Sequence, residues 1–102
     1  MDELDVLLRN DRYPRSAGYS ARWMIDGAMG PNPVWQAEAL AGVLPLEPGM
    51  RVLDLGCGTA LSSIFLAKEY GVEVWATDLW VKPDENLRRV AEAQLEDQVH
   101  PI

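Results

Sequence analysis

The stretch VLDLGCGTA, residues 52–60, decides how the chain is read. A short apolar run ends at Leu55 and two glycines follow at once, which indicates a buried strand that turns tightly into a helix. Glycines in such a turn adopt backbone dihedrals closed to other residues and let a ligand approach the main chain. The stretch therefore predicts a ligand-binding loop at the carboxyl end of a strand.

Strands and helices are predicted to alternate from residue 50 onward. We expect strands at 50–55, 72–77 and 99–102, and helices at 60–70 and 83–96. In the last helix the expected apolar stripe is Leu87, Val90, Ala91 and Leu95. This alternation is typical of an α/β fold, here a Rossmann-like parallel sheet with flanking helices. Three short strands are few for such a sheet, whose two faces must both be covered.

The N-terminal third is expected to be partly helical and partly irregular. Leucines at helical spacing predict a helix over 2–9, and Ser20 is a candidate N-cap for a helix that runs to Met29. Asn32 followed by proline predicts the start of a helix over 33–44. We therefore divide the chain into an N-terminal segment, residues 1–32, and a βαβαβ half-domain, residues 33–102.

Charge and cysteine content exclude several classes of function. Sixteen acidic against nine basic residues give a net charge of -7, which argues against binding to nucleic acid or to an anionic membrane. The single cysteine, Cys57, excludes an internal disulfide, and with one histidine we expect no metal site. The N-terminus lacks the charge pattern of a signal peptide, and no apolar stretch approaches about 18 residues. We expect a cytoplasmic protein.

Two carboxylates flank the predicted loop. Asp78 ends the second strand 22 residues after Gly56, where an acidic side chain can accept hydrogen bonds from both hydroxyls of a ribose. Leu79 and Trp80 follow it and could form an apolar wall for a purine ring. Asp54 lies two residues before the first glycine, where it would repel a pyrophosphate and attract an ammonium or sulfonium group. Together these residues predict a site for a nucleoside with a cationic tail.

Two other interpretations fit less well. A dinucleotide cofactor would favour G-x-G-x-x-G, but Leu61 stands where the third glycine belongs. Cys57 has no base nearby in sequence, so we interpret it as a small loop residue and not as a nucleophile. His100 likewise lacks a partner that would support a catalytic role. No catalytic residue is assigned.

The same residues resemble those of the class I S-adenosylmethionine-dependent methyltransferases. VLDLGCGTA is similar to the family's first motif, D/E-x-G-x-G-x-G, with Ala60 where a third glycine is common. VEVWATD looks like the family's second strand with its ribose-binding acid. The resemblance covers residues 33–102 and implies S-adenosyl-L-methionine as the cofactor. The cofactor-binding residues that it implies are Asp54, Gly56, Gly58, Asp78 and Leu79.

The resemblance also implies what surrounds this site. The family sheet has seven strands in the order 3-2-1-4-5-7-6, of which this chain would supply the first three, in the order 3-2-1. The expected function is methyl transfer to a small-molecule acceptor, with this chain as the cofactor-binding half of a truncated fold. A non-catalytic S-adenosylmethionine-binding or interaction module is the alternative. Because the first strand would be left with a free edge, we expect self-association.

One further pair in the N-terminal segment has two interpretations. Tyr19-Ser20 is similar to a Tyr-Ser pair that contacts the cofactor in cyclopropane-synthase-like methyltransferases. A match of two residues is short, so solvent-facing turn chemistry is the simpler interpretation of this pair.

Overall fold

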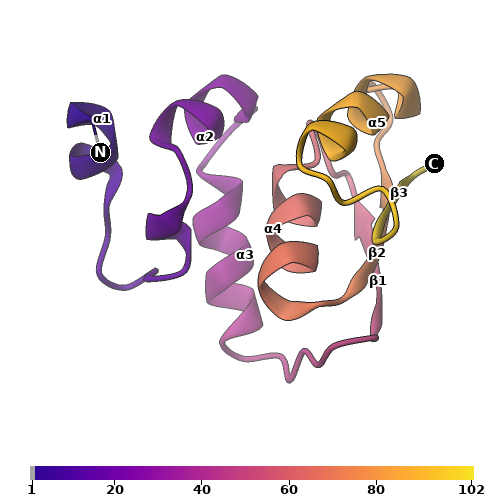
Figure 1. The fold of residues 1–102 in the computed structure, drawn as a ribbon, viewed down its shortest axis with the longest axis horizontal. Coiled ribbons are helices and arrows are strands. Elements are labelled where there is room, and N and C mark those ends of the chain that lie inside the picture. Colours follow the sequence, from indigo (N-terminus) through magenta and orange to yellow (C-terminus); the bar gives the residue numbers. More distant parts are fainter. Residues whose placement is uncertain (1) are drawn as a thin grey trace.

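The computed structural model describes residues 2–102 and contains a three-stranded parallel sheet in the order β1-β2-β3 (Figure 1). This is the predicted 3-2-1 order read from the other edge, so the predicted α/β class is confirmed. In chain order the elements are α1 (Glu3–Leu8), the 3-10 helix η1 (Ser16–Gly18), α2 (Ala21–Gly27), α3 (Pro33–Ala41), β1 (Arg51–Leu55), α4 (Leu61–Tyr70), β2 (Glu73–Thr77), α5 (Pro83–Glu92) and β3 (Val99–Pro101).

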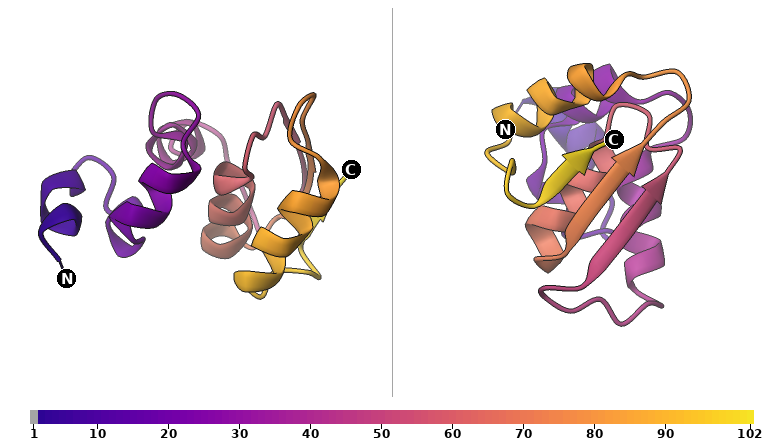
Figure 2. Two further views of the ribbon diagram at one scale, coloured as in Figure 1. Left: turned by 90° about the horizontal axis from the view of Figure 1, so that it is seen from above. Right: turned by 90° about the vertical axis from the view of Figure 1, so that its right-hand side faces the viewer.

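The two faces of the sheet differ. On one face, buried side chains of β2 and β3 pack against α4 and α5 to form the main core, which includes Val74, Ala76, Val90 and Val99. The right-hand view of Figure 2 shows the strands in front, α3 and α4 behind them and α5 along the top, so among residues 2–102 no helix covers the face toward the viewer. On that face Leu53 is 61% exposed and Leu55 is 79% exposed.

Helix α4 lies against the sheet directly after the glycine loop. It begins after Ala60, whose φ of 64° lies in the left-handed region, and it ends at Tyr70, before Gly71, which has a φ of 69°. The left-handed conformation costs a residue with a side chain roughly 1–2 kcal/mol. Ala60 is fully buried, so packing of its methyl group offsets part of this cost. Ala60 therefore adopts the backbone conformation for which glycine is favoured.

Helix α5 differs from its prediction in length and in rotation. It ends at Glu92 because Gln94 adopts a left-handed φ of 59° and stops the helix. The buried positions are Asn86 and Val90, whereas Leu87 is 51% exposed. The predicted stripe is therefore wrong at Leu87 and at the exposed Ala91. The hydrogen bonds of Asn86 fix the rotation, because its amide reaches the glycine loop.

The N-terminal helices stack outward from α4 (Figure 1). Helices α2 and α3 pack on α4 around Met24, Val34 and Phe65. Helix α1 packs on α2, where Asp5 accepts a hydrogen bond of 2.8 Å from the backbone N–H of Ala21. The predicted starts of these helices are confirmed, but α2 ends at Gly27 and α3 at Ala41, two and three residues earlier than expected.

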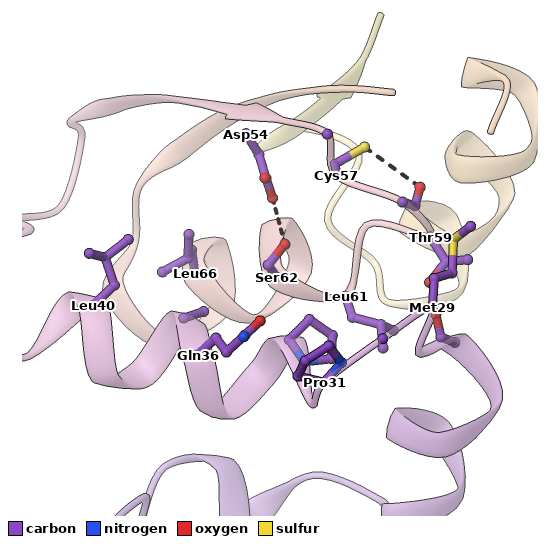
Figure 3. A pocket seen from close by; sticks show the side chains of 16 residues that line it. Met29, Pro31, Gln36, Leu40, Asp54, Cys57, Thr59, Leu61, Ser62 and Leu66 are labelled. Carbon is purple, nitrogen blue, oxygen red and sulfur yellow. Dashed lines mark hydrogen bonds between the residues drawn. The ribbon is translucent and has the colours of Figure 1, made fainter. Parts of the chain in front are cut away.

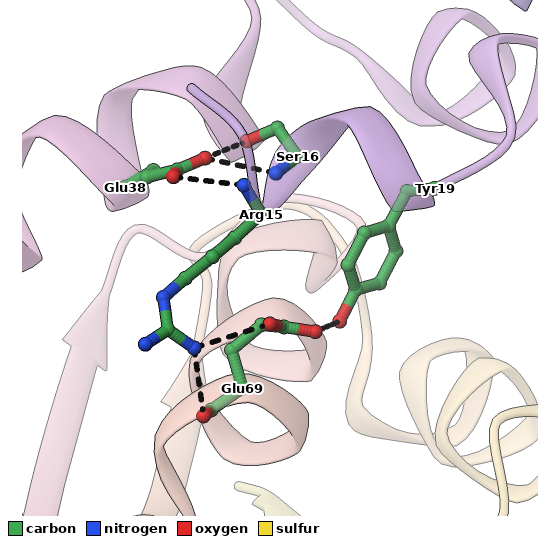
Figure 4. Close-up of polar contacts among 5 residues, drawn as sticks. All are labelled: Arg15, Ser16, Tyr19, Glu38 and Glu69. Atoms are coloured by element: carbon green, nitrogen blue, oxygen red, sulfur yellow. Dashed lines mark hydrogen bonds and ion pairs between the residues drawn. The ribbon is translucent and has the colours of Figure 1, made fainter. Parts of the chain in front are cut away.

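Two glutamates attach η1 to the helices beneath it (Figure 4). Glu38 of α3 accepts hydrogen bonds from the backbone N–H groups of Arg15 and Ser16 at 3.0 and 2.8 Å, and from the Ser16 hydroxyl at 2.7 Å. Glu69 of α4 accepts from the Tyr19 hydroxyl at 2.9 Å and pairs with Arg15 at 3.4 Å. The N-terminal segment is therefore held on the α/β layer by polar contacts as well as by apolar packing.

Within residues 2–102, every helix is too short or too polar to cross a bilayer.

Candidate functional site

Two hollows lie on either side of the glycine loop. The first cleft has a volume of about 390 Å³ and lies between the loop, the start of α4 and residues 27–40 (Figure 3). The second hollow has a volume of about 420 Å³ and is lined by Leu55, Gly56, Thr77, Asp78, Leu79 and Trp80. Gly56 lines both, so a ligand lying across Gly56 would extend into both hollows.

The glycine loop is tied to the end of β2. The backbone N–H groups of Gly56 and Cys57 both donate to the Thr77 carbonyl at 2.9 Å, and that of Gly58 donates to Asp78 at 3.0 Å. Gly56 and Gly58 have φ values of 76° and 55°, which a residue with a side chain adopts only at a cost. Because these three N–H groups are already used within the chain, the loop is poorly suited to bind a phosphate through them.

Asp54 brings a negative charge to the first cleft. Its Oδ2 accepts hydrogen bonds from the Ser62 and Ser63 hydroxyls at 2.6 and 2.7 Å. None of the side-chain hydrogen bonds within residues 2–102 uses Oδ1 of Asp54. The carboxylate also lies at the N-terminus of α4, whose dipole favours a negative charge. Among the described residues that line the cleft, Asp54 carries the single charge, so the cleft favours a cationic group over an anionic one.

Asp78 is held at the rim of the second hollow. One oxygen accepts from the Gly58 N–H, and the other accepts from the N–H groups of Trp80 and Val81 at 3.0 and 2.9 Å. The bonds from Val81, Trp80 and Gly58, in that order, lower the pKa of Asp78 below its usual 3.8. The carboxylate is therefore ionised at neutral pH and its direction is fixed, as a hydrogen-bond acceptor for hydroxyl groups must be.

The side chains after Asp78 leave apolar surface at the second hollow. Leu79 is 86% exposed and Trp80 is 81% exposed, and both line the hollow. Exposed apolar side chains of this size beside a fixed carboxylate are typical of a ligand-binding rim.

Asn86 of α5 holds the glycine loop from behind, which sequence reasoning missed. Its side chain is 1% exposed, and its amide donates to the Gly58 carbonyl at 2.9 Å while its oxygen accepts from Arg89 at 3.1 Å. Asn86 lies four residues before Val90 and seven before Ala93, so all three share one face of the helix. A polar residue on this otherwise apolar face is the sequence signal that could have identified Asn86. Arg89 lies one turn further along α5 and supports this amide through that hydrogen bond.

Cys57 is buried under the same loop. The residue is 7% exposed, and burial, with further contributions from Asp54 and Asp78, raises the pKa of its thiol to about 11. The thiol is therefore protonated at neutral pH, which agrees with its interpretation as a loop residue and not as a nucleophile.

The Tyr19-Ser20 pair lies away from both hollows. The Tyr19 ring packs against Trp23 and Phe65 with centroids at 5.5 and 5.3 Å, and burial, together with Glu69, raises the pKa of its hydroxyl. Ser20 caps α2 by accepting from the Trp23 N–H. Ser20 therefore has a local capping role and is exposed, whereas Tyr19 packs against the core instead of facing solvent as expected.

No three His, Cys, Asp or Glu side chains of residues 2–102 gather as they would around a metal ion.

Comparison with known proteins gives matches among solved structures. No protein-family model and no curated protein matches the chain. A methyltransferase from Geobacter sulfurreducens bound to S-adenosyl-L-homocysteine is 27% identical, with a TM-score of 0.61 over 79% of this chain. A geranyl diphosphate methyltransferase in complex with S-adenosylmethionine is 30% identical, with a TM-score of 0.61 over 68%.

The chain has the fold of the class I methyltransferases. It spans 34% and 29% of the lengths of these two structures. A methyltransferase from Thiobacillus denitrificans, 24% identical, has the same fold over 92% of this chain, with a TM-score of 0.58 and 36% of its own length covered. The methyltransferase fold therefore extends over most of the N-terminal segment as well as the sheet.

Proposed function

We propose that this chain is the donor-binding part of an S-adenosylmethionine-dependent methyltransferase that acts on a small-molecule acceptor. The observation that carries the proposal is the shared position of Gly56, which lines a cleft containing Asp54 and a hollow containing Asp78. A nucleoside lying across Gly56 would place a cationic tail near one carboxylate and a ribose near the other. The solved methyltransferases of this fold that hold S-adenosylmethionine or S-adenosyl-L-homocysteine support the same ligand.

Each proposed binding residue has a distinct task. Asp54 would attract the amino group of the methionine portion, and the Gly56 and Gly58 backbone would lie against that portion without side chains between them. Asp78 would accept hydrogen bonds from the ribose hydroxyls, and Leu79 would contact the adenine. The residues fit this ligand for two reasons. The N–H groups of the loop already donate hydrogen bonds within the chain, which disfavours a phosphate, and the two carboxylates can accept hydrogen bonds from an amino group and from hydroxyl groups.

The cofactor supplies a methyl group on a positively charged sulfur. What the chain contributes is binding and orientation, since transfer of a methyl group depends mainly on holding donor and acceptor in line and on excluding water. Asp54 stabilises positive charge in the cleft, and the fixed carboxylate of Asp78 sets the direction of the nucleoside. We assign no residue of this chain to proton transfer.

Two measurements test the proposal. Isothermal titration with S-adenosyl-L-homocysteine should give saturable binding, whereas NAD, which carries a pyrophosphate, should not bind. Transfer of a radiolabelled methyl group from S-adenosylmethionine to a panel of small neutral and cationic acceptors then tests activity. Binding of NAD without binding of S-adenosyl-L-homocysteine would contradict the proposal.

The alternative is a module that binds S-adenosylmethionine, or a protein partner, without catalysis. The bare sheet face favours it, because Leu53 and Leu55 leave apolar surface that a partner could cover. Saturable binding with no transfer to any acceptor would favour this alternative. Absence of binding would reduce it to an interaction module.

We further propose that the chain self-associates through β1 and this bare face, and that it works in a reducing, cytoplasmic setting. The outer edge of β1 and the hollow beside it, lined by Arg51, Val52, Leu53, Trp75 and Ile102, support the first part. The free, buried thiol of Cys57 supports the second. Sedimentation at rising concentration tests the first part: a monomer at every concentration would contradict it.

A further inference from the structure

Residues 27–31, between α2 and α3, form one wall of the first cleft. Gly27, Met29, Gly30 and Pro31 all line it. Figure 3 shows Met29 and Pro31 on the far side of the cleft from Asp54. A ligand held by Asp54 and the glycine loop would therefore be enclosed by this N-terminal wall.

The wall touches the glycine loop directly. The Thr59 hydroxyl donates a hydrogen bond of 2.6 Å to the Gly27 carbonyl. A Cβ at Gly27 would lie 2.9 Å from the Thr59 oxygen and from both terminal methyl groups of Leu61, so any larger residue would push these side chains away from their present positions. Above the loop, the Met29 sulfur lies 3.3 Å from the position of a Cβ on Gly58.

The rest of the N-terminal segment is anchored separately. Glu38 and Glu69 hold η1, which precedes α2, as Figure 4 shows. Helix α2 is thus fixed at its start by these contacts and at its end by Thr59. Beyond that end Met29 is 65% exposed, so moving residues 28–31 would disturb little buried apolar surface. Segments of this kind open at low free-energy cost.

We propose that residues 27–31 cover the bound donor and that the Thr59 hydroxyl acts as the latch that keeps them closed. In this role Thr59 is a positioning residue: it determines how long the donor stays and does not take part in the transfer. The inference rests on the proposed function, because the ligand covered is the donor proposed above.

The test compares two substitutions at Thr59. Thr59→Val keeps the shape of the side chain and removes the hydroxyl, whereas Thr59→Ser keeps the hydroxyl. Dissociation of S-adenosyl-L-homocysteine is followed by stopped-flow tryptophan fluorescence, with Trp80 at the second hollow as reporter. Amide hydrogen exchange of residues 28–30 is measured in the ligand-free protein, and circular dichroism confirms that each variant is folded.

The latch predicts that Thr59→Val dissociates about three- to tenfold faster than wild type, the range expected for losing one hydrogen bond. Its residues 28–30 should exchange faster even without ligand, and Thr59→Ser should restore both properties. If Thr59→Val releases the ligand and exchanges its amide hydrogens at the wild-type rates, the proposed role of Thr59 is wrong, while the proposal of donor binding stands. Failure of the wild-type chain to bind would overturn both.

Discussion

Asp78 accepts a hydrogen bond of 3.0 Å from the backbone N–H of Gly58, across 20 residues of sequence. This bond joins the end of β2 to the glycine loop at the end of β1. The glycine loop and the acidic residue, which the sequence predicts separately, are therefore in direct contact. The same carboxylate therefore orders the loop and, in our proposal, binds the ribose. A substitution at Asp78 or at Gly58 should affect both loop order and ligand binding.

Gly58→Val should abolish binding of S-adenosyl-L-homocysteine. Valine would have to adopt the φ of 55° seen at Gly58, at a cost of roughly 1–2 kcal/mol, and its Cβ would press on the Met29 sulfur at 3.3 Å. Calorimetry measures the binding and circular dichroism the fold. Gly18→Val is the control, because an added Cβ there meets nothing within 4 Å. Normal binding by a folded Gly58→Val protein would mean that the loop is only a turn.

Asn86→Ala should lower the free energy of unfolding by about 1–3 kcal/mol, because it leaves the Gly58 carbonyl without its buried donor. Chemical denaturation measures the change. Glu85→Ala, at the exposed neighbouring position of α5, is the matched control and should change stability by about 0.5 kcal/mol or less. Equal effects of the two substitutions would show that Asn86 does not support the loop.

The Cys57 thiol should resist alkylation in the folded protein. With a pKa raised to about 11 by burial, about one thiol in a thousand is ionised at pH 8, and the side chain is 7% exposed. Iodoacetamide labelling followed by mass spectrometry should therefore be slow in buffer and fast in denaturant. Rapid labelling of the folded chain would contradict the buried position of Cys57.

Features that depend on neighbouring residues were predicted correctly from the sequence, whereas features that depend on contacts between distant residues were missed. The strand that ends at Leu55, the helix that ends before Gly71 and the caps at Ser20 and Asn32 all depend on neighbours within a few residues, and they were predicted correctly. The prediction of the apolar stripe of α5 was wrong because the rotation of the helix is decided by a hydrogen bond from Asn86 to Gly58, 28 residues earlier in the chain.

In the candidate site, too, the sequence predicted the residues of the loop but missed a contact between distant residues. Loop chemistry pointed to Asp54, Gly56, Gly58 and Asp78, whose positions on adjacent strand ends follow from the parallel order. The contact of Thr59 with Gly27 joins residues 32 positions apart, and nothing local in the sequence indicates that α2 ends against the loop. Contacts between the N-terminal segment and the sheet layer therefore had to come from the three-dimensional structure.

Asp78 should also make stability depend on pH in one direction. Its folded pKa lies below 3.8 because of the bonds from Val81, Trp80 and Gly58, so its stabilisation is present above that pH and is lost as the pH falls through the folded value. The difference in melting temperature between wild type and Asp78→Asn should be constant from about pH 8 to 5 and should shrink below about pH 4. A difference that grows on acidification would contradict this assignment.

The most direct test of the donor site is calorimetric titration of S-adenosyl-L-homocysteine into the wild-type chain and into Asp78→Ala. We expect saturable binding to wild type and an affinity roughly 10- to 100-fold weaker in the variant, because the variant loses hydrogen bonds from the ligand to a charged acceptor. Circular dichroism before the titration confirms that the variant is folded. An affinity in Asp78→Ala equal to that of wild type would contradict the assignment of this site.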